Sequence, residues 1–234
     1  MSRLAPILDR LEALHGAPPP LLFHGALEMI LWENVVYLAD DAGRAVAFEA
    51  LRKLTRFAPR TILAESDSAL RKVTSLAGIL PDNQVKKLRR IAQLVRDEFD
   101  GDLDAVLKLP LPKALRTLMK FPGIGEPGAD KILLFSRTHP FLAPESNGLR
   151  VLLRLGFGEE QPAYAARYRT AQAAALKELP AECDALIRAH HLLRHHGQET
   201  CRRTRPACEE CPLTRECRFY QEAASARRKA PDAR

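Results

Sequence analysis

The sequence contains little that favours a β-structure, a membrane protein or a secreted protein. Alternation of apolar and polar residues, which marks a half-buried strand, is hard to find anywhere in the 234 residues. No apolar run reaches the roughly 20 residues that a membrane-spanning helix needs. The N-terminal MSRLAPILDRLEALHG has no apolar signal-peptide core. There is also no internal repeat and no low-complexity linker, so we expect a cytoplasmic globular protein with no membrane partner.

Helical periodicity, by contrast, runs through most of the chain. The segment LRRIAQLVRDEF (88–99) carries its apolar residues on one helix face and its charges on the other. The apolar face consists of Leu88, Ile91, Leu94, Val95 and Phe99. The 17 prolines, Pro59 and Pro81 among them, fall mostly at segment edges, where proline starts or stops helices. We predict an all-α protein of about ten helices, in one large domain or two modest ones.

The charge balance is mildly basic and uneven. Lys and Arg number 36 against 29 for Asp and Glu, and the pI is about 9.3. This excess suits a polyanionic partner without requiring one. From Arg188 onward the chain is rich in Arg and His, and it ends in RRKAPDAR, which we interpret as a solvated, frayed terminus.

Four of the five cysteines form a cluster with the spacing C-x6-C-x2-C-x5-C inside seventeen residues. In a reducing compartment such a cluster indicates a metal centre rather than disulfides. Structural zinc sites usually pair two short knuckles, whereas this segment has one short gap and two long ones, which favours an iron–sulfur cluster over zinc. The predicted ligands are Cys201, Cys208, Cys211 and Cys217. Cys183 stands apart in an apolar helix and is predicted to be a small buried core residue.

The segment FPGIGEPGADKILLF (121–135) predicts a tight glycine turn between two helices. The backbone amides of Gly123 and Gly125 and the start of the second helix would together form a seat for an anion such as a phosphate. Ile124 would tuck inward, and Pro127 suits the first turn of the second helix. A plain helix–helix turn is the alternative interpretation.

Taken together, these motifs resemble the endonuclease III family of DNA repair glycosylases. The resemblance rests on the cysteine spacing with the preceding HHLLRHHGQETC (190–201), and on FPGIG followed by PESNGLRVLLRLG (144–156). Weaker similarity extends to LEMILWENVV (27–36) and AGILPDNQVKKLRRI (77–91), so the match covers most of the chain from about residue 20.

The resemblance implies an all-α, two-domain helix-hairpin-helix DNA glycosylase fold. Residues 25–133 would form a six-helix barrel ending in the hairpin. Residues 1–24 and 134–234 would form a second helical domain whose loop, 201–217, holds a [4Fe-4S] cluster. Such a protein would act in base excision repair as a monomer, would associate with the nucleoid in a bacterium, and would bind damaged or mismatched double-stranded DNA with one base flipped out.

The resemblance also implies which residues touch DNA. The hairpin would hold a phosphate, and Asn147 could donate to another; the cluster loop would add contacts to the backbone. Asn34, together with Ile79 or Leu80, would fill the gap left by the flipped base. The hairpin residues are Gly123, Ile124, Gly125 and Gly128, and the loop residues are Arg202, Arg203, Arg205 and Arg215. Candidates for contacts to the base are Trp32, Glu33, Tyr37, His139 and His190, for which a core or surface position is the more common alternative.

The sequence departs from the family at both expected catalytic positions. Bifunctional members carry a nucleophilic lysine two residues after the second hairpin glycine, where this chain has Pro127. Lys131 lies one turn further, about 5 Å away, and is a candidate rescue nucleophile or else a lysine at the edge of the core. AP-lyase activity is therefore expected to be weak or absent.

The second departure is Glu145, which stands where the family has an aspartate. A carboxylate there could stabilise an oxocarbenium-like sugar and activate a water molecule. Alternatively, it could only favour the helix N-terminus that follows. The leading hypothesis is thus a glycosylase that hydrolyses the N-glycosidic bond with water. The alternatives are a catalytically silent protein that binds lesions or abasic sites, and a zinc-containing helical protein unrelated to repair.

Overall fold

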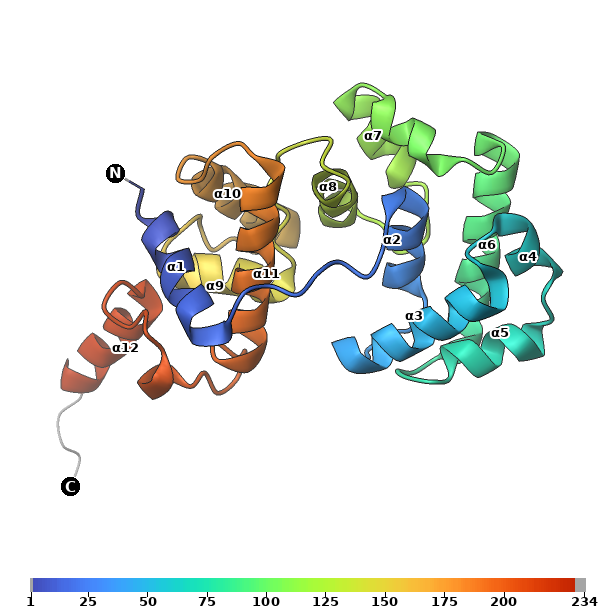
Figure 1. Cartoon of the computed structure of the whole chain (residues 1–234). Coiled ribbons are helices and arrows are strands. Elements are labelled where there is room, and N and C mark those ends of the chain that lie inside the picture. Colours follow the sequence, from blue (N-terminus) through green and yellow to red (C-terminus); the bar gives the residue numbers. More distant parts are fainter. Residues whose placement is uncertain (1, 230–234) are drawn as a thin grey trace. The chain divides into compact units, whose positions relative to one another are not determined.

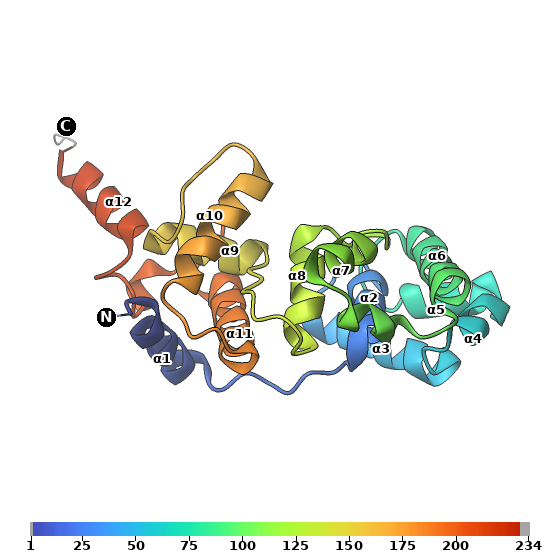
Figure 2. The same ribbon diagram turned by 90° about the horizontal axis from the view of Figure 1, so that it is seen from above.

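The computed structural model describes residues 2–229, and the predicted frayed terminus extends beyond them (Figure 1, Figure 2). The described residues form helices and connecting segments without any strand, which confirms the all-α prediction. Twelve α-helices and two 3-10 helices are present within them, against the ten or so expected. None of the helices in this part of the chain is long and apolar enough to cross a membrane.

Residue contacts divide the chain into two compact units, 20–139 and 1–19 with 140–234. The unit formed by residues 20–139 contains seven α-helices and one 3-10 helix. They are α2 (Gly25–Asn34), α3 (Asp41–Thr55), α4 (Pro59–Ala64), α5 (Asp67–Thr74), α6 (Pro81–Phe99), η1 (Leu103–Lys108), α7 (Leu111–Leu118) and α8 (Glu126–Phe135). Pro59 and Pro81 are the first residues of α4 and α6, as the positions of the prolines predicted.

Helix α6 is the longest element of this unit, and α2, α4 and α5 pack against it. The predicted apolar face is buried at Leu88, Ile91, Leu94 and Val95, whereas Phe99 is only half-buried. Burial of such a side chain contributes roughly 1.5–3 kcal/mol. The unit is therefore organised around the face that the 3.6-residue period defines.

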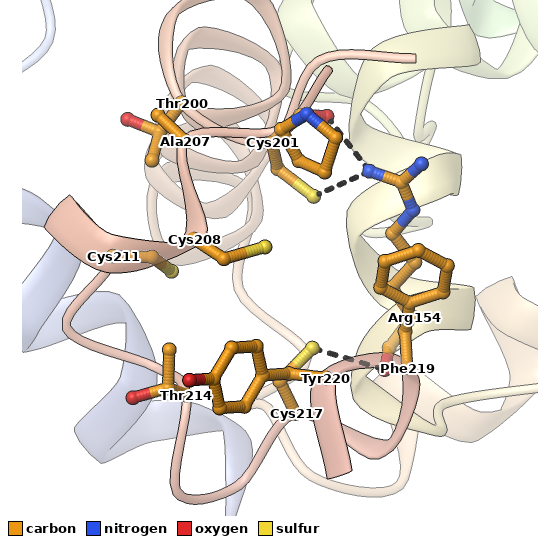
Figure 3. Close-up of a pocket in the computed structure, with 11 residues that line it drawn as sticks. Arg154, Thr200, Cys201, Ala207, Cys208, Cys211, Thr214, Cys217, Phe219 and Tyr220 are labelled. Carbon is orange, nitrogen blue, oxygen red and sulfur yellow. Dashed lines mark hydrogen bonds between the residues drawn. The ribbon is translucent and has the colours of Figure 1, made fainter. Parts of the chain in front are cut away.

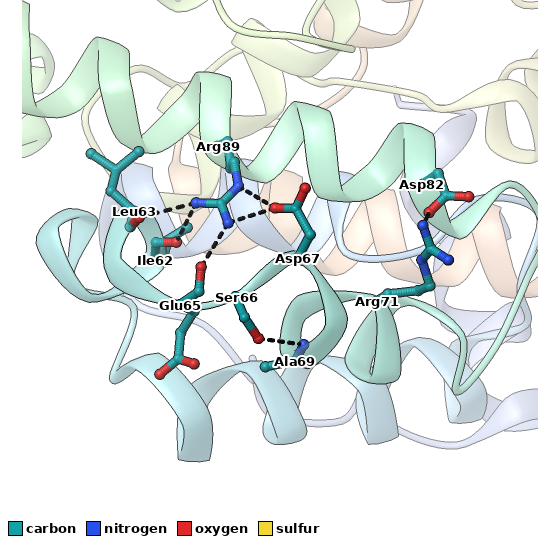
Figure 4. A network of polar contacts seen from close by, with 9 residues as sticks. All are labelled: Ile62, Leu63, Glu65, Ser66, Asp67, Ala69, Arg71, Asp82 and Arg89. Carbon is teal, nitrogen blue, oxygen red and sulfur yellow. Dashed lines mark hydrogen bonds and ion pairs between the residues drawn. The ribbon is translucent and has the colours of Figure 1, made fainter.

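A single arginine on α6 fixes the connection between α4 and α5 (Figure 4). Arg89 donates to the carbonyls of Leu63 at 3.0 Å and Glu65 at 2.6 Å, and to Asp67 Oδ1 at 2.6 Å. These carbonyls lie at the C-terminal end of α4, where a helix leaves acceptors unsatisfied. Arg89 thus supplies the missing donors and joins both short helices to α6.

The other unit contains five α-helices and one 3-10 helix among its described residues. They are α1 (Leu4–His15), α9 (Ser146–Leu155), α10 (Tyr164–Leu176), α11 (Cys183–Glu199), η2 (Cys208–Glu210) and α12 (Arg218–Lys229). Helices α9 and α11 form its main packing pair, and α1 lies against α11.

The close approach of α9 and α11 depends on Gly197. A Cβ built on Gly197 would lie 2.5 Å from the carbonyl oxygen of Asn147, which is too short for any side chain. Gly148 faces Leu193 on the opposite helix in the same way, with a Cβ distance of 3.4 Å. The glycine of HHGQET therefore brings the start of α9 next to the segment that leads into the cysteine loop.

Candidate functional site

The predicted glycine turn joins α7 and α8. Gly123 has φ +73°, in the left-handed region that favours glycine, and Ile124 is buried at 5% exposure beneath the turn. Gly125 is the N-cap of α8 and Pro127 is the second residue of that helix. The turn geometry and the inward Ile124 therefore agree with the prediction from FPGIG.

Gly125 has no internal reason to be glycine. Its φ of −96° is open to any residue, and a Cβ built there would meet only Cδ of Pro127, at 3.9 Å. The amide of Gly128, in the first turn of α8, has no acceptor within the helix, because the first turn of any helix lacks one. A small residue beside donors that face outward is the arrangement in which an anion can approach the backbone.

Asn34, predicted to fill the gap left by a flipped base, has a different role in this structure. Its side chain is 1% exposed and donates from Nδ2 to the carbonyls of Ile30 and Pro122, each at 2.9 Å. Oδ1 of Asn34 also closes off the space beside Gly123, where a Cβ would lie 3.0 Å away. The prediction is wrong for this conformation because the amide braces the hairpin from α2 instead of reaching out of the protein.

Leu80, the other predicted gap filler, is exposed. Its side chain is 53% exposed and its φ is +57°, a left-handed conformation that is strained for leucine. A second loop carries Leu38, with 70% exposure and φ +54°. The amide of Ile79 donates to the carbonyl of Tyr37 at 2.8 Å, so the two loop tips are joined.

Leu38 was not identified from the sequence. The only signal was an apolar residue two positions before Asp40, the N-cap of α3, where a loop would ordinarily be polar. Leu38 and Leu80 are thus two exposed leucines in left-handed conformations on neighbouring loops. Neither side chain is buried in the core of this unit, so packing does not explain why these positions are apolar.

Lys131 is paired with a carboxylate. Its Nζ lies 2.5 Å from Oε1 of Glu33 on α2, and the two side chains are 17% and 29% exposed. An ammonium that donates to a carboxylate has no free electron pair with which to attack a sugar. This pairing agrees with the alternative interpretation of Lys131 as a lysine at the edge of the core.

Glu145 is the N-cap of α9 and all of its visible contacts are local. Oε1 accepts from the amides of Asn147 at 2.8 Å and Gly148 at 3.1 Å. Oε2 accepts from Nδ2 of Asn147 at 3.1 Å and Oγ of Ser146 at 3.2 Å. Oε1 is thus anchored by rigid backbone donors, whereas Oε2 is held by two side chains that can rotate away.

The start of α9 is connected to the cysteine loop by Arg150. Its Nη2 donates to Oδ1 of Asn147 at 2.8 Å and to the carbonyl of Gly197 at 2.6 Å. Its Nε donates to the carbonyl of Cys201 at 2.9 Å. Burial lowers the pKa of Arg150 from its usual value, and the positive charge of Arg154 acts in the same direction.

The four clustered cysteines border one small, partly open cavity (Figure 3). Arg154 closes one side, where its Nη1 donates to Sγ of Cys201 at 3.3 Å and to the carbonyl of Arg202 at 2.9 Å. Phe219 stacks on the Arg154 guanidinium at 4.4 Å. The loop therefore holds its four thiols around a shared space.

The side chains bordering this cavity are of the kind that a thiolate-bound metal centre requires. Thiolates bound to one zinc ion lie about 3.8 Å apart. Among residues 2–229, no three His, Cys, Asp or Glu side chains converge closely enough to hold one ion. Burial raises the pKa of Cys211 to about 11 and also raises that of Cys217. A bound cation would favour the deprotonated thiolates.

Arginines surround a broad groove beside the cysteine loop, within the unit formed by residues 1–19 and 140–234. Glu160 is the one acidic residue among those that line it. The arginines are Arg150, Arg154, Arg167, Arg202 and Arg203. Arg205 and Arg215 are exposed elsewhere on the same loop. Such a groove can bind a phosphodiester backbone.

One further prediction is wrong in this structure. Cys183, expected in the core, is half-exposed because it is the first residue of α11. His190 is 4% exposed and its Nδ1 lies 2.7 Å from the carbonyl oxygen of Ala143, so of its two interpretations the core position applies. Trp32 packs edge-to-face on Phe48 at 5.2 Å, while Tyr37 remains 46% exposed.

Known proteins that resemble this chain in sequence or in fold include endonuclease III and a DNA glycosylase. Endonuclease III of Sulfolobus acidocaldarius is 25% identical over 203 residues, which is 85% of this chain and 82% of that protein. A solved endonuclease III–DNA covalent intermediate, in an estranged-adenine complex, superposes with a TM-score of 0.72 at 21% identity, covering 95% of this chain and 97% of the other. A thermostable thymine-DNA glycosylase superposes with a TM-score of 0.73 at 15% identity, covering 94% and 95%. No protein-family model matches the chain.

Proposed function

Since the chain is a member of the helix-hairpin-helix DNA glycosylase family, we propose that it is a monomeric DNA N-glycosylase that releases a flipped base by water attack. The substrate is a damaged or mismatched base in duplex DNA. The observation that carries this proposal is the asymmetric carboxylate of Glu145, anchored through Oε1 and exchangeable at Oε2.

Glu145 has the two properties that a hydrolytic carboxylate needs. The amides of Asn147 and Gly148 fix its direction, and the donors on Oε2 are side chains that a water molecule can replace. The negative charge stabilises the positive sugar as the N-glycosidic bond breaks and its electron pair leaves with the base. The water oxygen then bonds to C1′, and the carboxylate accepts the proton.

The same contacts disfavour a covalent amine mechanism. Pro127 has no nucleophile, and Lys131 donates to Glu33. A Schiff base would require Lys131 to leave that ion pair and to act a full turn away from the expected position, whereas such attack tolerates about 1 Å. We therefore propose that AP-lyase activity is weak or absent.

Three features would hold the DNA. The amides that follow Gly125 would bind one phosphate. The arginine-lined groove beside the cysteine loop, with Arg202 and Arg203 exposed, would bind further phosphates. Leu38 and Leu80 would enter the base stack, where apolar side chains can replace an extruded base.

We further propose that Cys201, Cys208, Cys211 and Cys217 hold a [4Fe-4S] cluster in the cavity they border. When bound, the cluster would supply a covalent cross-link of the loop and a redox-active centre. Metal analysis distinguishes this from zinc. A brown protein that absorbs near 400 nm and contains about four iron atoms per chain is expected, whereas a colourless protein containing zinc would contradict it.

The test of the catalytic assignment is Glu145→Gln. Glutamine can still accept from both amides through Oε1 but carries no charge, so it separates capping from catalysis. Asp40→Asn is the matched control, because Asp40 is the N-cap of α3 and accepts from the amide of Gly43 at 2.7 Å.

Base release is measured on a panel of duplexes that each carry one lesion or mismatch. Each product is assayed with and without hot alkali, and with borohydride. The parent and Asp40→Asn should give strand breaks only after alkali, with no trapped adduct. Glu145→Gln should bind DNA but release base at least a hundredfold more slowly. Release at the parental rate would exclude Glu145, and a borohydride adduct would implicate a lysine.

A catalytically silent lesion-binding protein is the second candidate. It is favoured by the capping contacts of Glu145, which already satisfy both carboxylate oxygens, and by Pro127. Tight binding to a lesion without product under any of these conditions would support it.

A further inference from the structure

Two histidines connect the surface of the protein to one of the clustered cysteines. Nε2 of His15, at the end of α1, lies 3.1 Å from Nδ1 of His196 on α11. Nε2 of His196 in turn lies 3.5 Å from Sγ of Cys211. His196 is 1% exposed, whereas His15 is half-exposed, so the chain of contacts runs from solvent to sulfur.

A cluster ligand would fix the direction of both hydrogen bonds. A thiolate bound to metal has no proton and can only accept, so Nε2 of His196 must carry the hydrogen. A neutral imidazole has a single N–H, which leaves Nδ1 of His196 as an acceptor. Nε2 of His15 must therefore donate to it. One chemical state of Cys211 thus sets the tautomers of two histidines.

We propose that His196 raises the reduction potential of the cluster by donating its Nε2 hydrogen to Cys211, and that His15 holds His196 in the tautomer that can do so. The proposal rests on the proposed [4Fe-4S] cluster. Each added electron makes the cluster and its thiolates more negative, so a hydrogen-bond donor stabilises the reduced form more than the oxidised one. Both histidines are positioning residues, because neither would touch substrate or iron.

The fold explains why a residue near the start of the chain can take part. Helix α1 packs on α11 within one unit. Its buried residues are Leu4, Ile7, Leu8 and Leu11. That packing places His15 against the last turns of α11. His195, next to His196, also touches the His15 ring at 4.8 Å between centroids, but it is exposed and makes no hydrogen bond to sulfur in the described structure.

The matched set of variants follows from these contacts. His196→Leu removes the donor, and His196→Gln restores an N–H near the position of Nε2. His15→Leu removes the outer donor and leaves His196 free to adopt the other tautomer. His195→Asn changes the neighbouring exposed histidine and is the control. Arg154, which donates to Cys201 at 3.3 Å, is unchanged in all four.

The measurement is the midpoint potential of the cluster by protein-film voltammetry, with iron content and the absorbance near 400 nm measured on each full-length protein. His196→Leu should shift the midpoint to a more negative value, and His15→Leu should shift it in the same direction by less. His196→Gln should return most of the way to the parent, and His195→Asn should match it. If His196 and His15 had only a structural role, the variants would differ in iron retention but would not show this ranking of midpoint potentials.

The outcomes distinguish failure of the cluster proposal from failure of the proposal that His196 and His15 tune its potential, called here the histidine relay. A parent protein without iron overturns both. A loaded parent whose midpoint equals that of loaded His196→Leu overturns the relay and leaves the cofactor standing. If His196→Leu does not retain iron, His15→Leu decides, and an unchanged midpoint in that variant overturns the relay.

Discussion

The guanidinium of Arg150 donates to Oδ1 of Asn147 at 2.8 Å. The same side chain donates to the carbonyl of Cys201 at 2.9 Å, so one arginine holds both the start of α9 and the first cysteine of the loop. Asn147 in turn donates to Oε2 of Glu145. The proposed catalytic carboxylate and the proposed cluster are therefore three hydrogen bonds apart within one unit.

Replacing Arg150 with Met should impair both features at once. The variant loses hydrogen bonds to Asn147, Gly197 and Cys201. The carbonyl of Gly197 loses its side-chain donor, whereas that of Cys201 keeps a longer contact from Arg154 at 3.4 Å, so the cost is about 1–3 kcal/mol. Iron retention and base release should both fall. The measurements are urea unfolding, iron content and the oligonucleotide assay.

Arg188→Met is its control. Arg188 also makes three side-chain hydrogen bonds, to Asp9 and Glu12 on α1. It should lose stability with little change in base release per folded molecule. If Arg150→Met lowers stability alone, as Arg188→Met does, the link between the cap and the loop has no functional role.

The two glycines of the hairpin should respond differently to alanine. Gly123→Ala must place a Cβ at φ +73° and 3.0 Å from Asn34, so it should lose more than about 1 kcal/mol of unfolding free energy. A Cβ in Gly125→Ala makes only an ordinary contact with Cδ of Pro127 at 3.9 Å, so this variant should lose at most about 1 kcal/mol as a poorer cap. Its DNA affinity should nevertheless fall by about tenfold or more, because the Cβ obstructs a phosphate. DNA affinity is measured by fluorescence anisotropy. If Gly125→Ala binds DNA as tightly as the parent, the proposed phosphate site after Gly125 is refuted.

Leu80 should show a trade-off between stability and function. Asparagine tolerates the left-handed conformation better than leucine, so Leu80→Asn should gain about 1 kcal/mol in urea unfolding. It should release base more slowly, since a polar side chain replaces the apolar one in the stack. Leu38→Asn should behave in the same way. Leu76→Asn, at an exposed leucine in the same unit, should leave base release unchanged. Equal effects from all three would contradict a specific role for the loop tips.

Acid should weaken the docking of α1. Burial, with help from His195, lowers the pKa of His15 below its ordinary value of 6.5, and Glu199 opposes the shift. The unfolded chain therefore binds a proton more readily than the folded one. This contribution to stability is present above pH 6.5 and is lost as the pH falls through the folded pKa.

His15→Gln tests this dependence, because glutamine cannot be protonated but can still donate to His196. Urea unfolding at about pH 7.5 and about pH 5.5 should show a smaller loss of stability in the variant than in the parent. His195→Gln should retain the parental pH dependence more closely. Identical losses in the parent and His15→Gln would exclude His15 as a source of the effect.

Local sequence patterns predicted the elements well. The period at Leu88, Ile91 and Val95 gave a buried helix face, Pro59 and Pro81 began helices, and Gly123 formed the turn. These features depend on residues within one or two turns of each other, where backbone sterics and amphipathic spacing decide the outcome.

The roles of individual side chains were harder to predict because their partners are distant in the sequence. The amide side chain of Asn34 is of a type that can contact DNA, but it donates to the carbonyl of Pro122. Lys131 forms an ion pair with Glu33, which lies on a helix far earlier in the chain. The only signal for Leu38 was an apolar residue two positions before the N-cap Asp40, which does not reveal its exposure. No local pattern records which helices pack together, and packing decides whether a polar side chain faces solvent or the interior.

The sequence by itself determined that this protein is helical, that four of its cysteines cluster with the spacing C-x6-C-x2-C-x5-C, and that position 127 carries a proline without a nucleophilic side chain. Only the tertiary structure decided that Glu145 is anchored through one oxygen, and that His15 and Cys211 meet His196 from opposite ends of the chain. The physical reason is that spacing restricts what a segment can bind, whereas hydrogen-bond direction depends on atoms that folding brings within about 3 Å.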